Sequence, residues 1–501
     1  MPRSQPPAGG PLAAIDIGSN SFRLEIGDLQ HGRYRRVAYL KETVRLGAGL
    51  DAASLLSEPA ALRGLDCLAR FAERLQGFAE HRVRAVATQT LREARNRNAF
   101  LARAEPVLGF PIEVISGREE ARLIYSGVAH LQPSEHQRLV IDIGGRSTEM
   151  ILGQGLKPSV AESFQVGSVS LSMRWFGDGQ LNEAAFRAAQ VAAGAELEEA
   201  LTLFAPNLWT EALGSSGTVG AIAQILKSEG RGEDGITPAD LRWCIERCLR
   251  AGHIDKLQFA SMRDDRRAVI AGGLALLYTL QTHFGIERLH EAKGALRQGV
   301  IIDLDARLRA ASQDAPGDPR ELTVLGMQRR FGADAVQAER VAAVALKLHD
   351  SALADADPEW RRELAWACAL HEIGLMVSHH DHHRHSAYLV AHADAAGFSQ
   401  SQQRRIADLV LAQRGGLRKM EAQLANPNFA WQALALRLAI IECHARSAAQ
   451  AGAIRLRRTG PRAELRASPD WALANPRTVH LLHEEAQAWA RHNVLSLDLS
   501  L

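Results

Sequence analysis

Two short segments of the chain contain residue types that bind phosphate, in an order typical of a strand followed by a turn. Each starts with apolar residues, ends that run with an aspartate (Asp16 or Asp142), and continues with glycine and small polar residues. Glycine allows the backbone to approach a ligand closely, and consecutive N–H groups in a turn form an anion-binding concavity. The residues expected at phosphate are Gly18, Ser19, Asn20 and Ser21 in the first segment and Gly144, Gly145, Arg146, Ser147 and Thr148 in the second. Two such turns at a domain-sized spacing predict a duplicated α/β unit that holds phosphate between its halves.

Acidic residues beside these turns are suited to a divalent metal ion. We expect Asp16, Asp142 and Glu149 to hold Mg²⁺, directly or through water, because Mg²⁺ prefers oxygen ligands. Mn²⁺ is the alternative metal, and K⁺ is expected to stimulate. The competing interpretation of each aspartate is a turn-capping hydrogen bond, which is common at any single Asp-x-Gly sequence. For Glu149 it is an exposed position on a strand.

A pair of adjacent glutamates, Glu119 and Glu120, supplies a candidate general base. Ser116 and Glu119 fit the capping-box pattern of a helix start, which would occupy Glu119 structurally. Glu120 lies about 100° further around the helix and is the better candidate to face the cleft. The alternative is that both are surface residues.

Arginines are the expected phosphate ligands, because the guanidinium group matches phosphate oxygens with two donors at once. The candidates are Arg23, Arg92 and Arg266, and a solvent-facing salt bridge is the alternative for each. Gly214, Ser215, Gly217 and Thr218 open a predicted helix, whose N-terminus is a further anion site.

Six ordered segments carry a resemblance to a known family. They are residues 16–23, 90–92, 115–122, 142–149, 214–218 and 295–299. Together they resemble the long form of the bacterial exopolyphosphatase/guanosine pentaphosphate phosphohydrolase family. The resemblance implies that Glu120 is the catalytic base, and Arg266 belongs to the family pattern. Arg146 replaces the third glycine that is usual in this family, so it would be strained if its φ were positive.

The fold class predicted from these patterns is α/β. We expect two actin/hexokinase-like (ribonuclease H-like) domains, followed by an all-α HD-like domain and a small α+β tail domain. The expected boundaries are a disordered tail at 1–11, domain I at 12–132, domain II at 133–310, a linker at 311–320, the helical domain at 321–448 and the tail domain at 449–501. Alternation of strand and helix patterns supports the first two domains.

Histidines set the C-terminal half apart. His349, His371 and His385 have a spacing that resembles HD-type metal phosphohydrolases, but the central pair is His371-Glu372 rather than His-Asp. The longer glutamate would misplace its oxygens, so we expect an HD-like fold without HD chemistry. The run from His379 to His385 would bind metal adventitiously or line a loop.

Composition limits the partners. The 501 residues carry 59 basic and 57 acidic side chains, for a net charge of +2, so a polyanion would need a local concentration of arginines. The apolar stretch at 268–280 is too short to span a membrane, and no signal peptide is visible. We expect a cytoplasmic homodimer that binds no nucleic acid and makes no integral membrane contact, with peripheral membrane association left open.

The sequence therefore predicts an exopolyphosphatase that releases terminal phosphate processively from inorganic polyphosphate. The alternative substrate is guanosine pentaphosphate, with guanosine tetraphosphate as product. A third, non-enzymatic hypothesis is a catalytically dead sensor of polyphosphate or of a guanosine alarmone.

Overall fold

The protein is described by a computed structural model that covers residues 10–501 except 31, 312–317, 354–356, 447–452 and 493. The described chain forms two compact units, Met1–Asp318 and Pro319–Leu501. Their boundary falls within the predicted linker at 311–320. Most of that linker, and most of the predicted tail at 1–11, lie outside the described residues.

The first unit contains two five-stranded sheets of the same design. The first has the order β3-β2-β1-β4-β5, and the second has the order β10-β9-β6-β7-β8. In each sheet the strand that precedes a phosphate turn lies in the middle. It is antiparallel to the strand that follows it in the chain and parallel to its neighbour on the other side, so β1 lies between β2 and β4, and β6 lies between β7 and β9. The strands are β1 (Leu12–Ile17), β2 (Ser21–Gln30), β3 (Arg33–Thr43), β4 (Val83–Ala87), β5 (Ile112–Val114), β6 (Gln137–Ile143), β7 (Thr148–Gln154), β8 (Lys157–Phe164), β9 (Glu211–Ser215) and β10 (His290–Glu291). The sheets thus repeat one topology, as the paired turns predict.

Helices cover these sheets. They are α1 (Glu58–Arg74), α2 (Gln89–Glu93), α3 (Arg97–Leu108), α4 (Gly117–Leu131), α5 (Ser168–Trp175), α6 (Glu183–Leu197), α7 (Ser216–Ser228), α8 (Pro238–Ala251), α9 (Asp264–Arg267), α10 (Ile270–His283) and α11 (Leu296–Ala311). Their starts follow local chemistry: Ser116 accepts a hydrogen bond from the Glu119 N–H at the start of α4, and Thr237 caps α8 in the same way.

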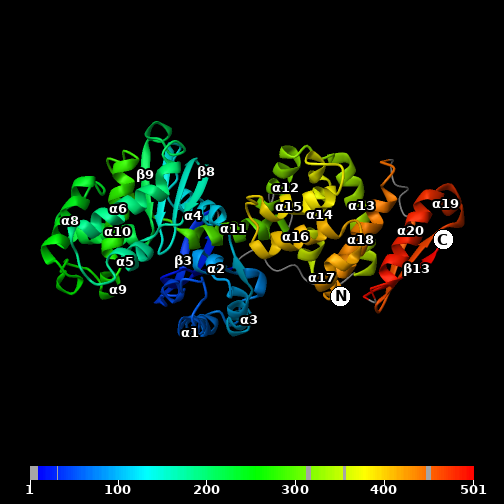
Figure 1. Ribbon diagram of the computed structural model, residues 1–501, viewed down its shortest axis with the longest axis horizontal. Helices are drawn as coiled ribbons and strands as arrows, with labels where there is room; N and C mark the ends of the chain where they lie inside the picture. Colours follow the sequence, from blue (N-terminus) through cyan, green and yellow to red (C-terminus); the bar gives the residue numbers. More distant parts are fainter. Residues whose placement is uncertain (1–9, 31, 312–317, 354–356, 447–452, 493) are drawn as a thin grey trace. The chain divides into compact units, whose positions relative to one another are not determined.

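Two helices connect the sheets. α4 packs on β7 and β8 of the second sheet, whereas α11 packs on β1 and β2 of the first, and the two helices pack against each other (Figure 1). One apolar core includes Ala14 and Val86 from the first sheet and Val140 and Ile151 from the second. Each helix therefore packs on the sheet that lies on the other side of the predicted division at residue 132.

The second unit is helical and ends in a small sheet. Its helices are α12 (Pro319–Arg330), α13 (Ala335–Ala352), α14 (Pro358–Leu370), α15 (His382–His392), α16 (Gln400–Ala412), α17 (Glu421–Leu424), α18 (Pro427–Glu442), α19 (Pro469–Ala474) and α20 (Pro476–Ala490). Strands β11 (Ile454–Thr459), β12 (Arg462–Ala467) and β13 (Ser496–Ser500) form the sheet. One core joins the helices to this sheet, including Trp431 and Trp489, so the predicted helical and tail domains pack as one body.

Several elements were not predicted. The edge strand β3 has a sequence rich in arginine and tyrosine and is exposed along most of its length, so it lacks the alternation of a half-buried strand. Part of the His379–His385 run lies in helix α15 rather than in a loop. Among the described residues, no helix is long and apolar enough to cross a lipid bilayer.

Candidate active site

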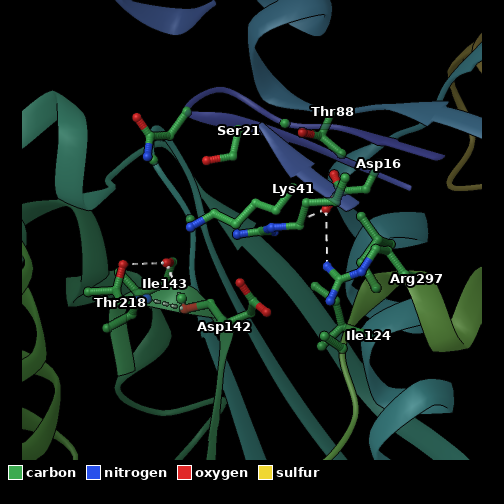
Figure 2. A pocket seen from close by; sticks show the side chains of 18 of the residues that line it. Asp16, Ser21, Lys41, Thr88, Ile124, Asp142, Ile143, Thr218 and Arg297 are labelled. Carbon is green, nitrogen blue, oxygen red and sulfur yellow. Dashed lines mark hydrogen bonds and ion pairs between the residues drawn. The ribbon is translucent and has the colours of Figure 1, made fainter. Parts of the chain in front are cut away.

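The phosphate turns after β1 and β6 face one cavity of about 290 Å³ in the first unit (Figure 2). The predicted residues that line it are Asp16, Gly18, Ser19, Asn20, Ser21, Arg23, Glu120, Asp142, Gly144, Gly145, Ser147, Gly217, Thr218 and Arg266. The N–H of Gly144 donates to the Ser147 carbonyl at 2.9 Å and closes the second turn. Residues from distant parts of the chain thus share one polar cavity, as the sequence predicts.

The start of α7 supports the second turn from behind. The hydroxyls of Ser216 and Thr218 donate to the Ile143 carbonyl at 2.9 and 3.0 Å, and Ser216 has a φ of +90°. Gly217 allows close packing, because a Cβ there would lie 2.2 Å from the Arg266 guanidinium. Gly214 and Ser215 end β9 and do not line the cavity; the Ser215 hydroxyl donates to the Gly294 carbonyl at 3.1 Å.

Cations from four elements line the cavity. Arg23 lies on β2, and its Nη1 donates to Asp16 Oδ2 at 3.1 Å, while Arg297 Nη1 lies 3.6 Å from the same oxygen (Figure 2). Lys41 enters from β3, and Arg266 lies on α9. Together they make the cavity suited to a polyanion.

Several cations that line the cavity were not predicted from the sequence. Arg36, Tyr39 and Lys41 line the cavity from the unpredicted strand β3. Arg297 and Lys293 also line it, and Arg297 stands in the 295–299 segment used for the family resemblance. The sequence motif therefore pointed to Arg297. It did not point to β3, because a strand without a buried face lacks the alternation of apolar and polar residues by which strands are predicted.

The carboxylates of the site are buried close together. Burial, together with the charges of Asp16 and Asp142, raises the pKa of Glu120 to about 7 against the opposing effect of Arg92. Burial also raises the pKa of Asp142 to about 6, although a hydrogen bond from Ser215 and the charge of Arg23 oppose the shift. Burial, with repulsion from Glu120 and Asp142, raises the pKa of Glu149 well above its usual value.

The chemistry of these carboxylates fits a hard divalent cation. Asp142 and Glu149 are cross-strand partners on β6 and β7, and burial raises the pKa of both carboxyl groups. Glu149 does not line the cavity and accepts a hydrogen bond from Ser163 at 2.8 Å. Within the described residues, no group of three or more acidic, histidine or cysteine side chains is arranged to hold a metal by itself. A site with so few carboxylates suits Mg²⁺, because this ion often binds one or two carboxylates together with water and phosphate oxygens.

Three predicted phosphate ligands turn away from the cavity. Arg92 donates to Glu120 Oε2 at 2.7 Å and to the Ile115 carbonyl at 3.1 Å. Arg146 pairs with Glu93 at 2.7 Å, and its φ is not in the left-handed region. Thr148 is buried and donates to the Val166 carbonyl at 2.6 Å. None of them lines the cavity, because each has a closer partner inside the protein.

The adjacent glutamates separate as predicted. Glu120 lines the cavity, whereas Glu119 accepts two hydrogen bonds from Arg122 at 2.7 and 2.8 Å and lies 3.8 Å from Arg84. Ser116 caps the helix by accepting from the Glu119 N–H at 3.1 Å. Glu119 therefore contributes its backbone N–H to the cap, whereas its carboxylate belongs to a buried ionic cluster.

The C-terminal histidines lie apart from this cavity in the sequence and in their contacts. His371 Nδ1 contacts the Cys368 carbonyl at 2.7 Å, and Glu372 pairs with Arg446 at 2.6 Å. Asp350, next to His349, pairs with Arg361. The acidic members of the HD-like pattern are thus paired with arginines.

Two family models match the chain. The Ppx/GppA phosphatase family matches residues 26–307, and domain III of the Ppx/GppA phosphatases matches residues 320–486. The guanosine-5'-triphosphate,3'-diphosphate pyrophosphatase of Vibrio cholerae is 36% identical over 479 residues, which is 95% of each chain. The enzyme of that name from Photobacterium profundum is 36% identical over 482 residues, again 95% of each chain.

Solved structures agree on the fold. An exopolyphosphatase from Cytophaga hutchinsonii matches with a TM-score of 0.54 and 25% identity, over 60% of this chain and 98% of that one. An exopolyphosphatase-like protein matches with the same TM-score and 24% identity, over 60% of this chain and 99% of that one. The predicted class, two actin/hexokinase-like domains followed by a helical domain, is confirmed. The chain belongs to the Ppx/GppA phosphatase family.

Proposed function

We propose that this protein hydrolyses guanosine pentaphosphate, releasing the terminal 5'-phosphate and leaving guanosine tetraphosphate. The observation that carries the proposal is end-to-end similarity to relatives named for that substrate, which extends through the C-terminal half. This reverses the preference for polyphosphate stated from the sequence. The cavity is consistent with either substrate, since both present a terminal phosphoanhydride.

The residues of the cavity suggest how the reaction proceeds. Water attacks the terminal phosphorus, the bond from phosphorus to the bridging oxygen breaks, and orthophosphate leaves. Glu120 accepts the proton of the water, and a pKa of about 7 suits a base that works near neutral pH. Arg23, Arg266 and Lys41 offset charge on the phosphate chain.

A metal ion completes the proposal. Asp142 and Glu149 would hold Mg²⁺, with water and phosphate oxygens as its other ligands. When bound, the ion would supply charge neutralisation at the terminal phosphate. Asp16, the third predicted ligand, is bonded to Arg23 and lies near Arg297, so its carboxylate instead positions these two cations.

Polyphosphate remains a second candidate substrate on one observation. Most of the polar side chains of the cavity wall other than its carboxylates are cationic or small, and Tyr39 is the aromatic side chain among the lining residues. Such a wall holds a chain of phosphates without requiring a base or sugar.

The test compares substrates on the same preparation. Phosphate release is measured with guanosine pentaphosphate, tripolyphosphate and long-chain polyphosphate, each with Mg²⁺ and with excess chelator. We expect kcat/KM to be at least about tenfold higher for guanosine pentaphosphate, which corresponds to about 1.4 kcal/mol in transition-state binding, and activity to vanish with chelator or in Asp142→Asn. A higher kcat/KM for long polyphosphate would instead support an exopolyphosphatase. Release from no substrate would leave the sensor hypothesis.

A further inference from the structure

A continuous series of hydrogen bonds joins the second phosphate turn to the candidate base. Arg146 Nη2 and Nε donate to Glu93 Oε2 at 2.7 and 3.1 Å. The Gln89 side-chain amide donates to Glu93 Oε1 at 2.6 Å, and its carbonyl oxygen accepts from Arg92 Nη2 at 2.7 Å and Nε at 3.0 Å. Arg92 Nη1 then donates to Glu120 Oε2 at 2.7 Å.

The series bridges the two sheet-containing halves of the first unit. Arg146 belongs to the turn after β6, whereas Gln89, Arg92 and Glu93 lie on the short helix α2 that follows β4. Every link is short, and the part of the series next to the base is screened from water, because Gln89 is buried and the Arg92 and Glu120 side chains are only 11% and 9% exposed. Buried networks of this kind fix side-chain orientation, because breaking one link leaves polar groups unsatisfied.

Arg146 also contacts Gly47, which in turn binds the first phosphate turn. Its Nη1 donates to the Gly47 carbonyl at 3.3 Å, and the Gly47 N–H donates to the Ser19 carbonyl at 2.8 Å. A Cβ at Gly47 would lie 2.8 Å from Arg146 Cδ, so glycine is needed for the arginine to lie there. One guanidinium thus contacts structure that supports both turns and the route to the base.

We propose that Arg146 is a positioning residue, which couples the geometry of the phosphate turns to the orientation of Glu120 through Glu93, Gln89 and Arg92. This inference rests on the proposed function, in which Glu120 takes the proton of the attacking water. A base that is displaced by a fraction of an ångström aligns water poorly, although the phosphate remains bound. Loss of the series therefore lowers kcat and leaves KM nearly unchanged, because Arg146, Glu93, Gln89 and Arg92 do not line the cavity.

The first experiment measures kcat and KM for guanosine pentaphosphate and for long-chain polyphosphate. In Arg146→Met we expect kcat to fall about tenfold to a hundredfold, the scale of a misplaced catalytic group, with KM within about twofold of the wild type. Arg146→Lys keeps one donor to Glu93 and should recover part of kcat. A rise in KM with kcat unchanged would make Arg146 a phosphate ligand and overturn the inference.

The second experiment distinguishes two roles of the Arg146–Glu93 ion pair. The pair either orients Glu120 through Gln89 and Arg92, or it only holds the two halves of the first unit together. The exchange variant with Arg146→Glu and Glu93→Arg restores an ion pair, but an arginine at position 93 cannot accept the Gln89 amide proton. We expect thermal stability to return while kcat stays low. Recovery of kcat would show that an ion pair between the halves is sufficient, and it would overturn the inference that the hydrogen-bond series orients Glu120.

Coupling to Arg92 supplies an independent check. In an Arg92→Met background, adding Arg146→Met should change kcat by less than about twofold, because residues in one network are not additive. Full multiplication of the two effects would overturn the inference.

The matched control is Arg118→Met. Arg118 on α4 pairs with Glu162 on β8 at 3.0 and 2.6 Å, and this pair does not reach Glu120. Its kcat should equal that of the wild type. A wild-type protein inactive on both substrates would overturn the proposed function and this inference together, whereas an active wild type with an unaffected Arg146→Met would overturn the inference alone.

Discussion

Two adjacent glutamates at the start of α4 have different surroundings because the helix turns by about 100° per residue. Glu120 points into the cavity beside Arg92, whereas Glu119 points toward α11, where Arg122 and Arg84 surround it together with Asp303. The charges of Arg122 and Arg307 hold the pKa of Asp303 far below its usual range, despite its burial. Glu120 is thus placed for catalysis, whereas the adjacent Glu119 is placed to stabilise the fold.

Substitution of each glutamate should therefore give opposite results. Glu120→Gln should lower kcat by at least about 10², the scale of a lost general base, with substrate affinity and unfolding free energy retained. Glu119→Gln should keep substrate affinity but lower the unfolding free energy by about 3 kcal/mol, because it breaks a buried ionic cluster. Steady-state kinetics and chemical denaturation measure the two effects. An inactive but stable Glu119→Gln would reverse the assignment.

Lys41 makes binding depend on pH. Burial, reinforced by repulsion from Arg266 and Arg23, lowers the pKa of Lys41 to about 8, although Asp265 partly opposes the shift. The ammonium is therefore charged below about pH 8 and loses its charge above it, in a cavity built for anions.

We expect the affinity for guanosine pentaphosphate to weaken as pH rises from 7 to 9. Titration calorimetry on the inactive Glu120→Gln variant measures this without turnover. Lys41→Arg keeps its charge throughout this range, so its affinity should stay nearly constant between these pH values. The same pH dependence in Lys41→Arg would exclude Lys41 as the titrating group.

At the scale of elements, the pair of helices between the sheets sets the spacing of the site. α4 carries Glu120 and α11 carries Arg297, and glycines let the two backbones approach closely. A Cβ at Gly299 would lie 1.7 Å from the Leu123 carbonyl oxygen, and one at Gly127 would lie 2.3 Å from that of Ala295. The reason for glycine here is contact rather than φ.

Gly299→Ala should force these helices apart. We expect the unfolding free energy to fall by about 1–3 kcal/mol, the usual cost of overpacking, and kcat to fall because Glu120 moves relative to Arg297. Gly326→Ala on α12 is the matched control, since a Cβ there meets nothing within 4 Å. Alanine in a helix is favoured over glycine by about 0.5–1 kcal/mol, so the control should be neutral or stabilising. Wild-type stability in Gly299→Ala would contradict the close contact.

At the scale of the whole molecule, all cavity residues belong to the first unit. Three of the apolar cores also lie entirely within residues 1–318, and the fourth lies within the second unit. The first unit therefore has the core and the chemistry needed to fold and hydrolyse a short phosphoanhydride. Selection among substrates is the contribution we expect from the second unit, and the homodimer expected from the sequence remains a prediction.

A chain that ends at Asp318 should fold cooperatively and release phosphate from tripolyphosphate. Its preference between guanosine pentaphosphate and polyphosphate should weaken. In the full chain, His371→Ala should leave phosphate release within about twofold, because every residue that lines the cavity belongs to the first unit. Circular dichroism and phosphate assays check these outcomes. A folded but inactive truncation would place part of the active site in the second unit.

The local features of the site were readable in the sequence. The two strand–turn segments, the cap at Ser116 and the division between Glu119 and Glu120 depend on neighbours a few residues away, and the structure contains each of them, although Arg146 and Thr148 turn away from the cavity. The repeated order of the two sheets follows from the same duplicated pattern. The choice between polyphosphate and guanosine pentaphosphate could not be made from these features, because phosphate turns recognise what the two substrates share.

Only the tertiary structure decided which cations line the cavity. Lys41 comes from an edge strand without a clear period, and Arg297 comes from a helix that packs on the opposite sheet. Arg92 and Arg146 stand in the motifs themselves but turn to Glu120 and Glu93 instead. An arginine has a long stem and five donors, so a motif fixes where its Cα lies but not which partner its guanidinium takes. That choice belongs to acceptors brought near it by folding.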